Sequence, residues 1–490
     1  MAPEMSPTVP VLTTVLGAVL LLALGGTRRG VLVGPLGLSV FMLVAIYGLR
    51  PLLMIDRAAY DFYGLRVTDG FQQATWVGLV AVVSLFVGYA ARAARRAPTR
   101  VGGPVPRDGG DGRTGAADAL ARVPLWGAAA FCVATVLLWF AAVAAYGGGA
   151  GFLSLMFSGR SAAVDARLEG MPAIVMALPV VGALALAAVR VVRDRRTRPT
   201  PGERLLYWAA VAFAVVPTTA LGTRRFLLPV VLLAVVAASA RAWDRRVRPS
   251  HVALAVVGLL ALAIVPFVRS AGSRSEGASL GTAMQEFYEV EGTRGVAESF
   301  LLSYDTEMFS YVAYAAPRLG GDLPVGWGRG TVLELVLAPL PAGVLSTETW
   351  SNVRLRAMFG GSCAEYLCPV PSLPGALYLD FALAGVVLGM LVFGWFVHAS
   401  QAALPSARGA RLVLTLGFIS FVPNVVRGNP AAQLAILAQV VVVTIVGLWL
   451  LRLLLGPGPP RSRHADPPGA GEAAPPPPSR VPDHLTKGVP

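Results

Sequence analysis

The chain has 490 residues, of which 55% are hydrophobic and only 14% charged, and its mean hydropathy is +0.64. This composition excludes an ordinary soluble domain and is typical of a polytopic membrane protein. The formal net charge of +14 does not indicate nucleic-acid binding. The arginines cluster in short loops between apolar runs, which is the layout expected for cytoplasmic loops of a membrane protein.

Apolar windows of about 17 to 25 residues are long enough to cross a hydrocarbon core of about 30 Å as helices. Eleven such windows occur, near 10–26, 31–49, 74–93, 125–146, 172–191, 205–221, 226–241, 251–268, 375–399, 411–426 and 432–455. The sixth and seventh are short and separated only by GTRR, so a re-entrant pair is the alternative there. We therefore predict an all-α fold, a polytopic helical membrane protein with about 11 transmembrane helices.

Arginine-rich loops fall on alternate sides of this span count, which predicts that the N-terminus lies outside and the C-terminus in the cytoplasm of a cell membrane. Residues 1–269 then hold spans one to eight, and 374–456 hold spans nine to eleven. Residues 270–373 form one large extracytoplasmic loop. The segment 457–490 is mostly Pro, Gly, Ala and Ser, which predicts a disordered cytoplasmic tail.

The large loop contains two apolar stretches. Residues 297–316 carry apolar side chains at helical spacing and end before Pro317, which predicts an amphipathic helix lying on the membrane or on the bundle. The side chains at this spacing are Phe300, Tyr304, Met308 and Tyr311. The second stretch, 331–340, is too short to span and is expected to pack back onto the membrane domain.

Two of the three cysteines, Cys363 and Cys368, lie in the same loop as CAEYLC. On an oxidising face, two thiols at this spacing favour a disulfide over free thiols. Metal binding would require further His or Cys ligands nearby, and the sequence offers none. No histidine falls on the predicted outer face, so neither a His base nor a His-containing metal site fits there.

Five arginines are predicted at membrane boundaries on the outer face, where arginine is costly and therefore a candidate for function. They are Arg160, Arg167, Arg224, Arg225 and Arg427. Guanidinium groups suit phosphate because their planar donors make bidentate, charge-assisted hydrogen bonds. The alternative is that these side chains extend to lipid headgroups or pair with Asp165 and Glu169.

The candidates for acid or base work on this face are carboxylates. They are Asp305, Glu307, Glu348 and Asp380. A carboxylate at a membrane edge can have its pKa raised by desolvation and then act as a base on a sugar hydroxyl. The alternative role is to cap a helix or to pair with arginine. Asp380 is the preferred candidate, because it lies among apolar residues.

Three passages resemble the O-antigen polymerase (Wzy-type) or oligosaccharide repeat unit polymerase family. They are GTRRFLLPVVL, GWGRGTVLELVLAPLPAGVLSTETW and PSLPGALYLDFALAGVVLGMLVFG. The first is similar to a Gly-x-Arg turn between two spans, the second to a Gly-rich loop segment with a Pro-containing turn, and the third to a span that opens with Tyr-x-x-Phe-Gly. Here Ala382 replaces the usual Gly after Phe381, and the basic residues often found after the loop proline are missing.

The resemblance implies a membrane glycosyltransferase that polymerises polyprenyl-diphosphate-linked oligosaccharide repeat units into a surface polysaccharide at the outer leaflet. The five arginines would hold the diphosphate and stabilise its leaving charge. A carboxylate, Asp380, Asp305 or Glu307, would deprotonate the acceptor hydroxyl, so the reaction needs neither metal nor cofactor. The implied partners are the lipid-linked substrate, membrane lipid, a flippase and a chain-length regulator.

Two other functions remain open at this stage. A transporter or flippase of lipid-linked sugars would favour internal repeats and polar residues deep within spans, and the spans here are nearly free of charge. A GT-C type glycosyltransferase with a monosaccharide donor often has paired acids in its first outer loop. The loop 50–73 offers only the spaced Asp56, Asp61 and Asp69.

Overall fold

The computed structural model of the chain is mainly helical in the residues that it describes, which are 5–25, 34–96, 120–147, 171–220, 224–243, 298, 301–302, 306–337, 349–360 and 369–455. The α-helices are α1 (Thr8–Gly25), α3 (Pro35–Val44), α4 (Arg50–Arg57), α5 (Phe71–Arg96), α7 (Leu125–Gly147), α10 (Ala173–Met176), α11 (Leu178–Arg196), α12 (Pro201–Ala220), α13 (Arg224–Ser239), α16 (Met308–Ala315), α17 (Glu334–Leu337), α18 (Trp350–Phe359), α19 (Ser372–Ala403), α20 (Gly409–Arg427) and α21 (Pro430–Leu454). Short π- or 3-10 helices are η1 (Ala45–Leu49), η2 (Leu120–Arg122), η3 (Ala240–Ala242), η4 (Ala316–Arg318) and η5 (Arg329–Leu333). One antiparallel hairpin pairs β1 (Asp61–Phe62) with β2 (Leu65–Arg66).

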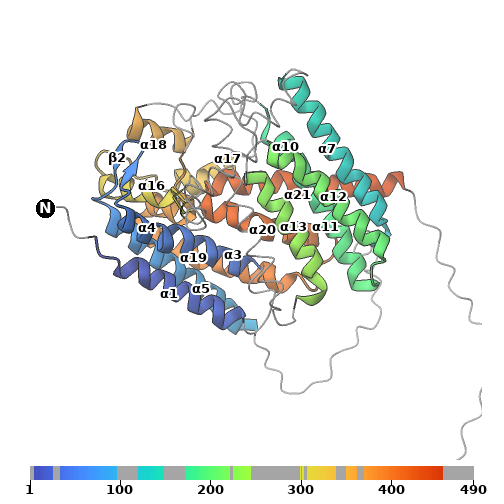
Figure 1. Cartoon of the computed structure of the whole chain (residues 1–490), viewed down its shortest axis with the longest axis horizontal. Helices are drawn as coiled ribbons and strands as arrows, with labels where there is room; N and C mark the ends of the chain where they lie inside the picture. Colours follow the sequence, from blue (N-terminus) through green and yellow to red (C-terminus); the bar gives the residue numbers. More distant parts are fainter. Residues whose placement is uncertain are drawn as a thin grey trace, which may run out of the picture.

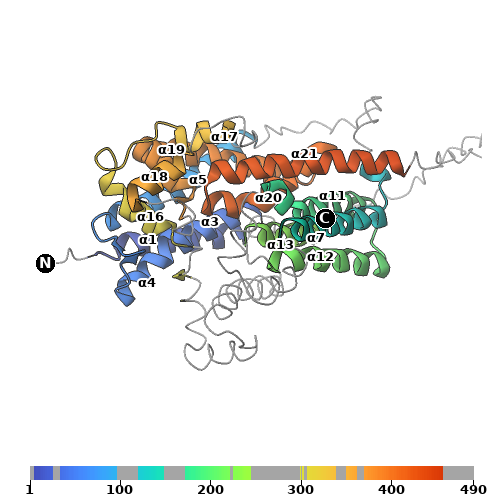
Figure 2. The same ribbon diagram turned by 90° about the horizontal axis from the view of Figure 1, so that it is seen from above.

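Two hydrophobic cores lie side by side. The first is built from α1, α3, α5, α16 and α19, and the second from α7, α11, α12, α13 and α21. Figures 1 and 2 show these groups as the two halves of the molecule, with α20 between them. Helix α20 joins both cores, because its residues 412–419 pack in the second and its residues 422–426 in the first.

Six of the described helical segments are long and apolar enough to cross a membrane, and two shorter apolar ones are Thr8–Ala23 and Arg225–Ser239. The all-α class is confirmed, and these helices have the length and composition of a multi-pass membrane protein. Each of the first seven and last three predicted spans coincides with a described helix, while 251–268 lies outside the described residues. The count of eleven crossings and the orientation remain predictions.

Helix α19 shows how such a helix can be half inside and half outside the bundle. Leu388, Val392 and Phe396 recur every four residues and are 66%, 56% and 51% exposed, so they form one outward-facing apolar stripe. The opposite face packs against α5 at glycines. A Cβ on Gly88 would overlap the carbonyl oxygen of Leu391, and one on Gly394 would overlap that of Leu85. Glycine is therefore required where the two backbones touch.

Part of the helix predicted over 297–316 is described as α16, and it is more deeply placed than a surface helix would be. Helix α16 spans Met308–Ala315, and all of its residues except Tyr314 are buried, so it has no exposed polar face. It packs between α5 and α19, where small residues allow close approach: a Cβ on Gly70 would overlap the carbonyl oxygen of Ala313. Of the two predicted placements, on the membrane or on the bundle, this part of the helix packs on the bundle, but it lacks the polar face of an amphipathic helix; Phe300 and Tyr304 lie outside the described residues.

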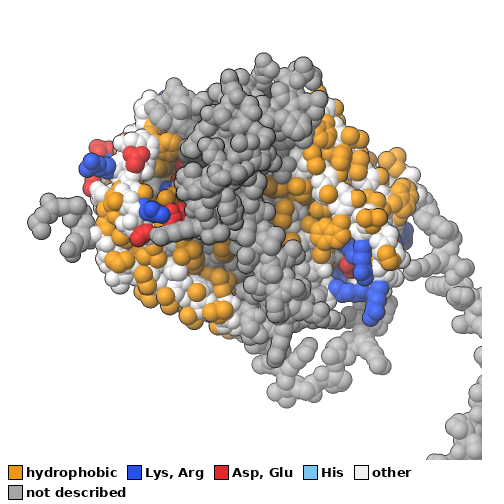
Figure 3. Space-filling model, viewed as in Figure 1, with side chains coloured by type: hydrophobic (Ala, Val, Ile, Leu, Met, Phe, Trp, Pro, Cys, Tyr) orange, Lys and Arg blue, Asp and Glu red, His pale blue; other side chains and the backbone are white. Residues whose placement is uncertain are grey.

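Arginines gather at the end of the bundle where α5, α11 and α19 finish. Arg195 donates to the backbone carbonyls of Leu404 and Ala407 just after α19, and Arg193 pairs with Glu203 of α12. The face shown in Figure 3 has mostly basic side chains gathered at this end and a mixture of acidic and basic ones at the other, and apolar side chains cover much of the described surface in both halves. The second end carries the candidate site.

Candidate functional site

Polar side chains are buried at the end of the bundle formed by α4, the hairpin, α16, α18 and the first residues of α21 (Figure 1). In the part of the chain that the structure describes, the buried polar residues at this end include Arg50, Thr306, Glu307, Ser310, Arg354, Asp380, Asn424 and Gln433. Burial of charged groups is costly unless they are paired or used, so this end is the natural place to look for function.

Arg50 is 6% exposed and lies where the π-helix η1 passes into α4. Its Nη1 donates to the carbonyl oxygen of Leu301, at 3.0 Å, and to Oγ1 of Thr306, at 2.9 Å. Its Nη2 donates to Oγ of Ser310, at 3.3 Å. These hydrogen bonds hold the segment around α16 against the second span, although more than 250 residues separate them.

Glu307 precedes α16 and is 7% exposed. Tyr63 of the hairpin donates from its hydroxyl to Oε2 of Glu307 at 3.0 Å. Burial raises the pKa of Glu307 from its ordinary 4.5 to about 7, and the Tyr63 hydrogen bond and the charges of Arg50 and Arg427 oppose this rise. A carboxylate that titrates near neutral pH can accept a proton from a hydroxyl group and release it again.

Arg427 connects this carboxylate to a second arginine, Arg225. The Nε of Arg225 donates to Oε1 of Gln433 at 3.3 Å, and its carbonyl oxygen accepts from Nδ2 of Asn424 at 2.6 Å. Arg427, the last residue of α20, interacts electrostatically with both Arg225 and Glu307. The like charges of Arg427 and Arg225 repel each other, while Glu307 acts on Arg427 with the opposite sign.

Asp380 is completely buried and has a full set of partners. Its Oδ1 accepts from Nη2 of Arg354 at 2.8 Å, and its Oδ2 accepts from the backbone N–H and the hydroxyl of Thr331, at 2.8 and 2.7 Å. Such pairing leaves both carboxylate oxygens of Asp380 occupied by donors. This is the alternative role considered from the sequence, and it favours Glu307 over Asp380 as the base.

The ion pair also explains the glycines of the GWGRG passage. A Cβ on Gly326 would overlap Oδ1 of Asp380, and one on Gly330 would crowd Arg354. The backbone N–H groups of Gly326 and Trp327 donate to the carbonyls of Leu379 and Asp380, which a kink at Phe381 and Ala382 leaves free of helix partners. The loop thus covers the Asp380–Arg354 ion pair and donates hydrogen bonds to the backbone carbonyls at the kink of α19.

We expect Asp380→Ala to lower the free energy of unfolding by about 3–5 kcal/mol, because it leaves the Arg354 charge buried without its carboxylate partner. Denaturant unfolding in detergent micelles measures this. Asp322→Ala, which removes an exposed carboxylate from the same loop, is the matched control and should have little effect. Equal stability of the two variants would contradict the structural role of the ion pair.

A third set of polar contacts joins the loop to the start of α21. The N–H of Ser351 donates to Oε1 of Glu334 at 3.0 Å, while Nδ2 of Asn429 donates to Oε2 of Glu334 at 3.2 Å and to Oγ of Ser351 at 2.8 Å. Asn429 also caps α21 through the N–H of Ala431. The Asn-Pro pair at 429–430 is a helix-start signal that could have been read from the sequence.

An apolar groove of about 760 Å³ runs along the outward face of α19 from the loop that covers Asp380. Its lining includes Trp327, Leu377, Phe381, Ala382 and Leu388. Ala382 has φ 53° and ψ −152°, a conformation almost restricted to glycine. Strained backbone of this kind is found at ligand sites more often than elsewhere.

Of the residues predicted from the sequence, Arg427 interacts with both Glu307 and Arg225, and Asp380 lies in a separate ion pair with Arg354. Arg160, Arg167, Asp305, Glu348, Cys363 and Cys368 lie outside the described residues, and for Arg224 only its place as the first residue of α13 is described. Sequence reasoning missed Arg50, Tyr63 and Arg354. An isolated arginine closing an apolar run was the available signal for Arg50.

The described residues therefore define a multi-pass helical membrane protein with a buried arginine and glutamate site at one end. No protein-family model, no curated protein and no solved structure matches the chain.

Proposed function

We propose that the protein is a membrane glycosyltransferase that joins polyprenyl-diphosphate-linked oligosaccharide repeat units into a surface polysaccharide at the extracytoplasmic leaflet. The observation that carries the proposal is the buried Glu307 with a pKa near 7, which interacts electrostatically with Arg427, which in turn interacts with Arg225. Glycosyl transfer from a diphosphate needs a base for the acceptor and positive charge for the leaving group, and this site offers both.

In the proposed reaction the acceptor hydroxyl attacks the anomeric carbon of the donor sugar. Its proton passes to the Glu307 carboxylate, and the bond between the anomeric carbon and the diphosphate oxygen breaks. The electron pair leaves with the diphosphate, whose charge Arg225 and Arg427 stabilise. Tyr63 orients the carboxylate through its hydrogen bond to Oε2. Proton transfer of this kind typically contributes a factor of about 10²–10⁴.

The groove along α19 supports a lipid-linked donor. It is apolar, it faces outward from the bundle, and it ends at the loop that packs on the buried polar end of the molecule. An isoprenoid chain has no hydrogen-bonding groups, so such a groove can hold it by contact alone. A water-soluble sugar donor would make no use of this surface.

Deleting the gene and sizing the surface polysaccharide tests the proposal. We expect single repeat units in place of polymer, with polymer restored when the gene is returned. Loss of repeat units from the surface would instead indicate a flippase that exports the lipid-linked sugar. Polymer of unchanged length would contradict the polymerase function.

A further inference from the structure

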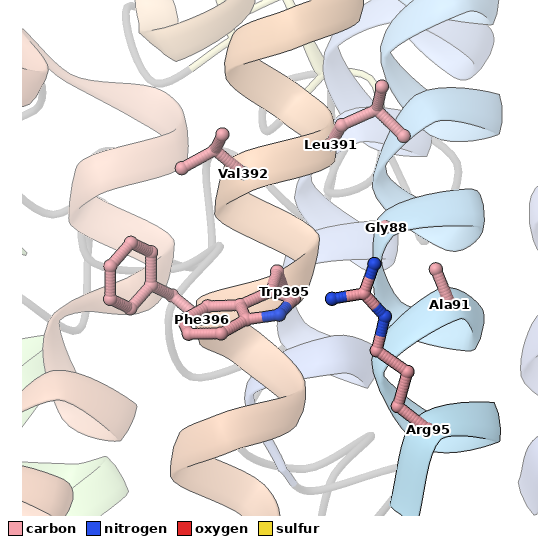
Figure 4. Close-up of a pocket in the computed structure, with 7 residues that line it drawn as sticks. All are labelled: Gly88, Ala91, Arg95, Leu391, Val392, Trp395 and Phe396. Carbon is pink, nitrogen blue, oxygen red and sulfur yellow. The ribbon is translucent and has the colours of Figure 1, made fainter.

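A second groove lies further along α19 toward the arginine-rich end, between α5 and α19, and Val392 lines both grooves (Figure 4). It has a volume of about 400 Å³. Gly88 and Ala91 form its wall on α5, while Leu391, Val392 and Phe396 line it from α19. The α5 side of the groove is shallow because glycine and alanine have little or no side chain. On the α19 side, the Phe396 side chain is 51% exposed.

The groove is held in shape by backbone contact. Gly88 touches the backbone at Leu391, and Gly394 touches the backbone at Leu85, so the two helices cannot move closer or roll without a clash. A groove fixed in this way is present before any ligand arrives, which lowers the ordering cost of binding.

Positive charge marks one end of the groove. The guanidinium of Arg92 lies 3.3 Å from the centre of the Trp395 ring. Arg95 is exposed one turn further along α5, and Figure 4 shows it pointing across the groove toward Trp395. Helix α5 contains no Asp or Glu, and the one acid of α19 is Asp380, which pairs with Arg354 at the other end of the molecule.

We propose that this groove binds one anionic phospholipid from the leaflet on the arginine-rich side. An acyl chain lies against Leu391, Val392 and Phe396, and the phosphate accepts hydrogen bonds from Arg95 and from the indole N–H of Trp395. Tryptophan and arginine at the end of apolar helices occupy the depth of the lipid headgroups, where basic residues attract anionic lipid. This inference is independent of the proposed glycosyltransferase function.

Native mass spectrometry of the purified full chain with added phosphatidylglycerol or phosphatidylcholine tests the proposal. We expect the wild type to retain one phosphatidylglycerol and to lose phosphatidylcholine. Arg95→Ala should retain phosphatidylglycerol about fivefold less, since one basic residue contributes about that factor to anionic lipid binding. The matched control is Arg411→Ala, which removes an exposed arginine at the start of α20 and should leave retention unchanged.

A second variant separates the groove from simple surface charge. Ala91→Trp fills the groove from the exposed face of α5 and keeps every arginine, so it should also lose the bound lipid. Retention by Ala91→Trp together with loss from Arg95→Ala would show a diffuse electrostatic contact and overturn the groove. Equal retention by Arg95→Ala and Arg411→Ala, or equal retention of the two lipids by the wild type, would also overturn the proposal.

Discussion

Replacing Glu307 with Gln should lower polymerisation by about 10²–10⁴-fold, because glutamine keeps the shape and the hydrogen bond from Tyr63 but cannot take a proton. Polymer length and amount, compared at equal protein levels in the membrane, measure this. Glu298→Gln is the matched control: this glutamate lies close in the chain but pairs with Arg57, so its loss should leave polymerisation near normal.

The pH dependence that Glu307 gives the wild-type protein has two parts with opposite signs. The wild-type rate should rise with pH through about 7, because only ionised Glu307 can act as a base. The free energy of unfolding should move the other way. Folded Glu307 binds its proton more tightly than the unfolded chain does, so its contribution of about 3 kcal/mol is full below pH 4.5 and is lost as the pH rises through 7.

Both parts should disappear in Glu307→Gln. Tyr63→Phe should shift the rise in rate to higher pH, since it removes a hydrogen bond that favours the charged carboxylate. Normal polymer from Glu307→Gln at matched protein levels would end the role of Glu307 as the base.

Replacing Arg427 or Arg225 with Lys should strongly impair polymerisation at one of the two positions at least, and Ala should impair it further, by roughly 2–5 kcal/mol of transition-state stabilisation. Lysine keeps the positive charge but loses the planar pair of donors that a diphosphate can accept from. Arg66→Ala removes an exposed arginine from the hairpin at the same end and should have little effect.

The alternative role of these arginines gives a different pattern. If they only anchor helix ends to lipid headgroups, Lys should restore full polymer length, and Ala should mainly reduce the amount of protein in the membrane. Normal polymer from the variant with Lys at both positions would end the diphosphate-binding hypothesis. Replacing Arg224, which directly precedes Arg225, tests whether this neighbouring arginine can substitute for Arg225.

Helix positions followed from the sequence with little help. A run of about 20 apolar residues forms a helix that spans hydrocarbon wherever it occurs in the chain, because the backbone must satisfy its own hydrogen bonds. The arginines at predicted helix ends could also be picked out from the sequence, and the structure places Arg225 near the start of α13 and Arg427 at the end of α20. The glycines of the GWGRG passage could be noticed in the sequence, but their close contacts with Asp380 and Arg354 could be seen only in the structure.

Which charged groups meet is a property of tertiary packing alone. Asp380 was the preferred base because it stands among apolar residues in the sequence, and the fold instead brings Arg354 to it from 26 residues away. Glu307 looked like one acid among several in a polar loop, and burial at the end of the bundle raised its pKa toward neutrality. Local sequence determines helix and hydropathy, whereas desolvation and charge pairing depend on atoms contributed by distant segments, and only their arrangement in space decides which carboxylate can exchange a proton.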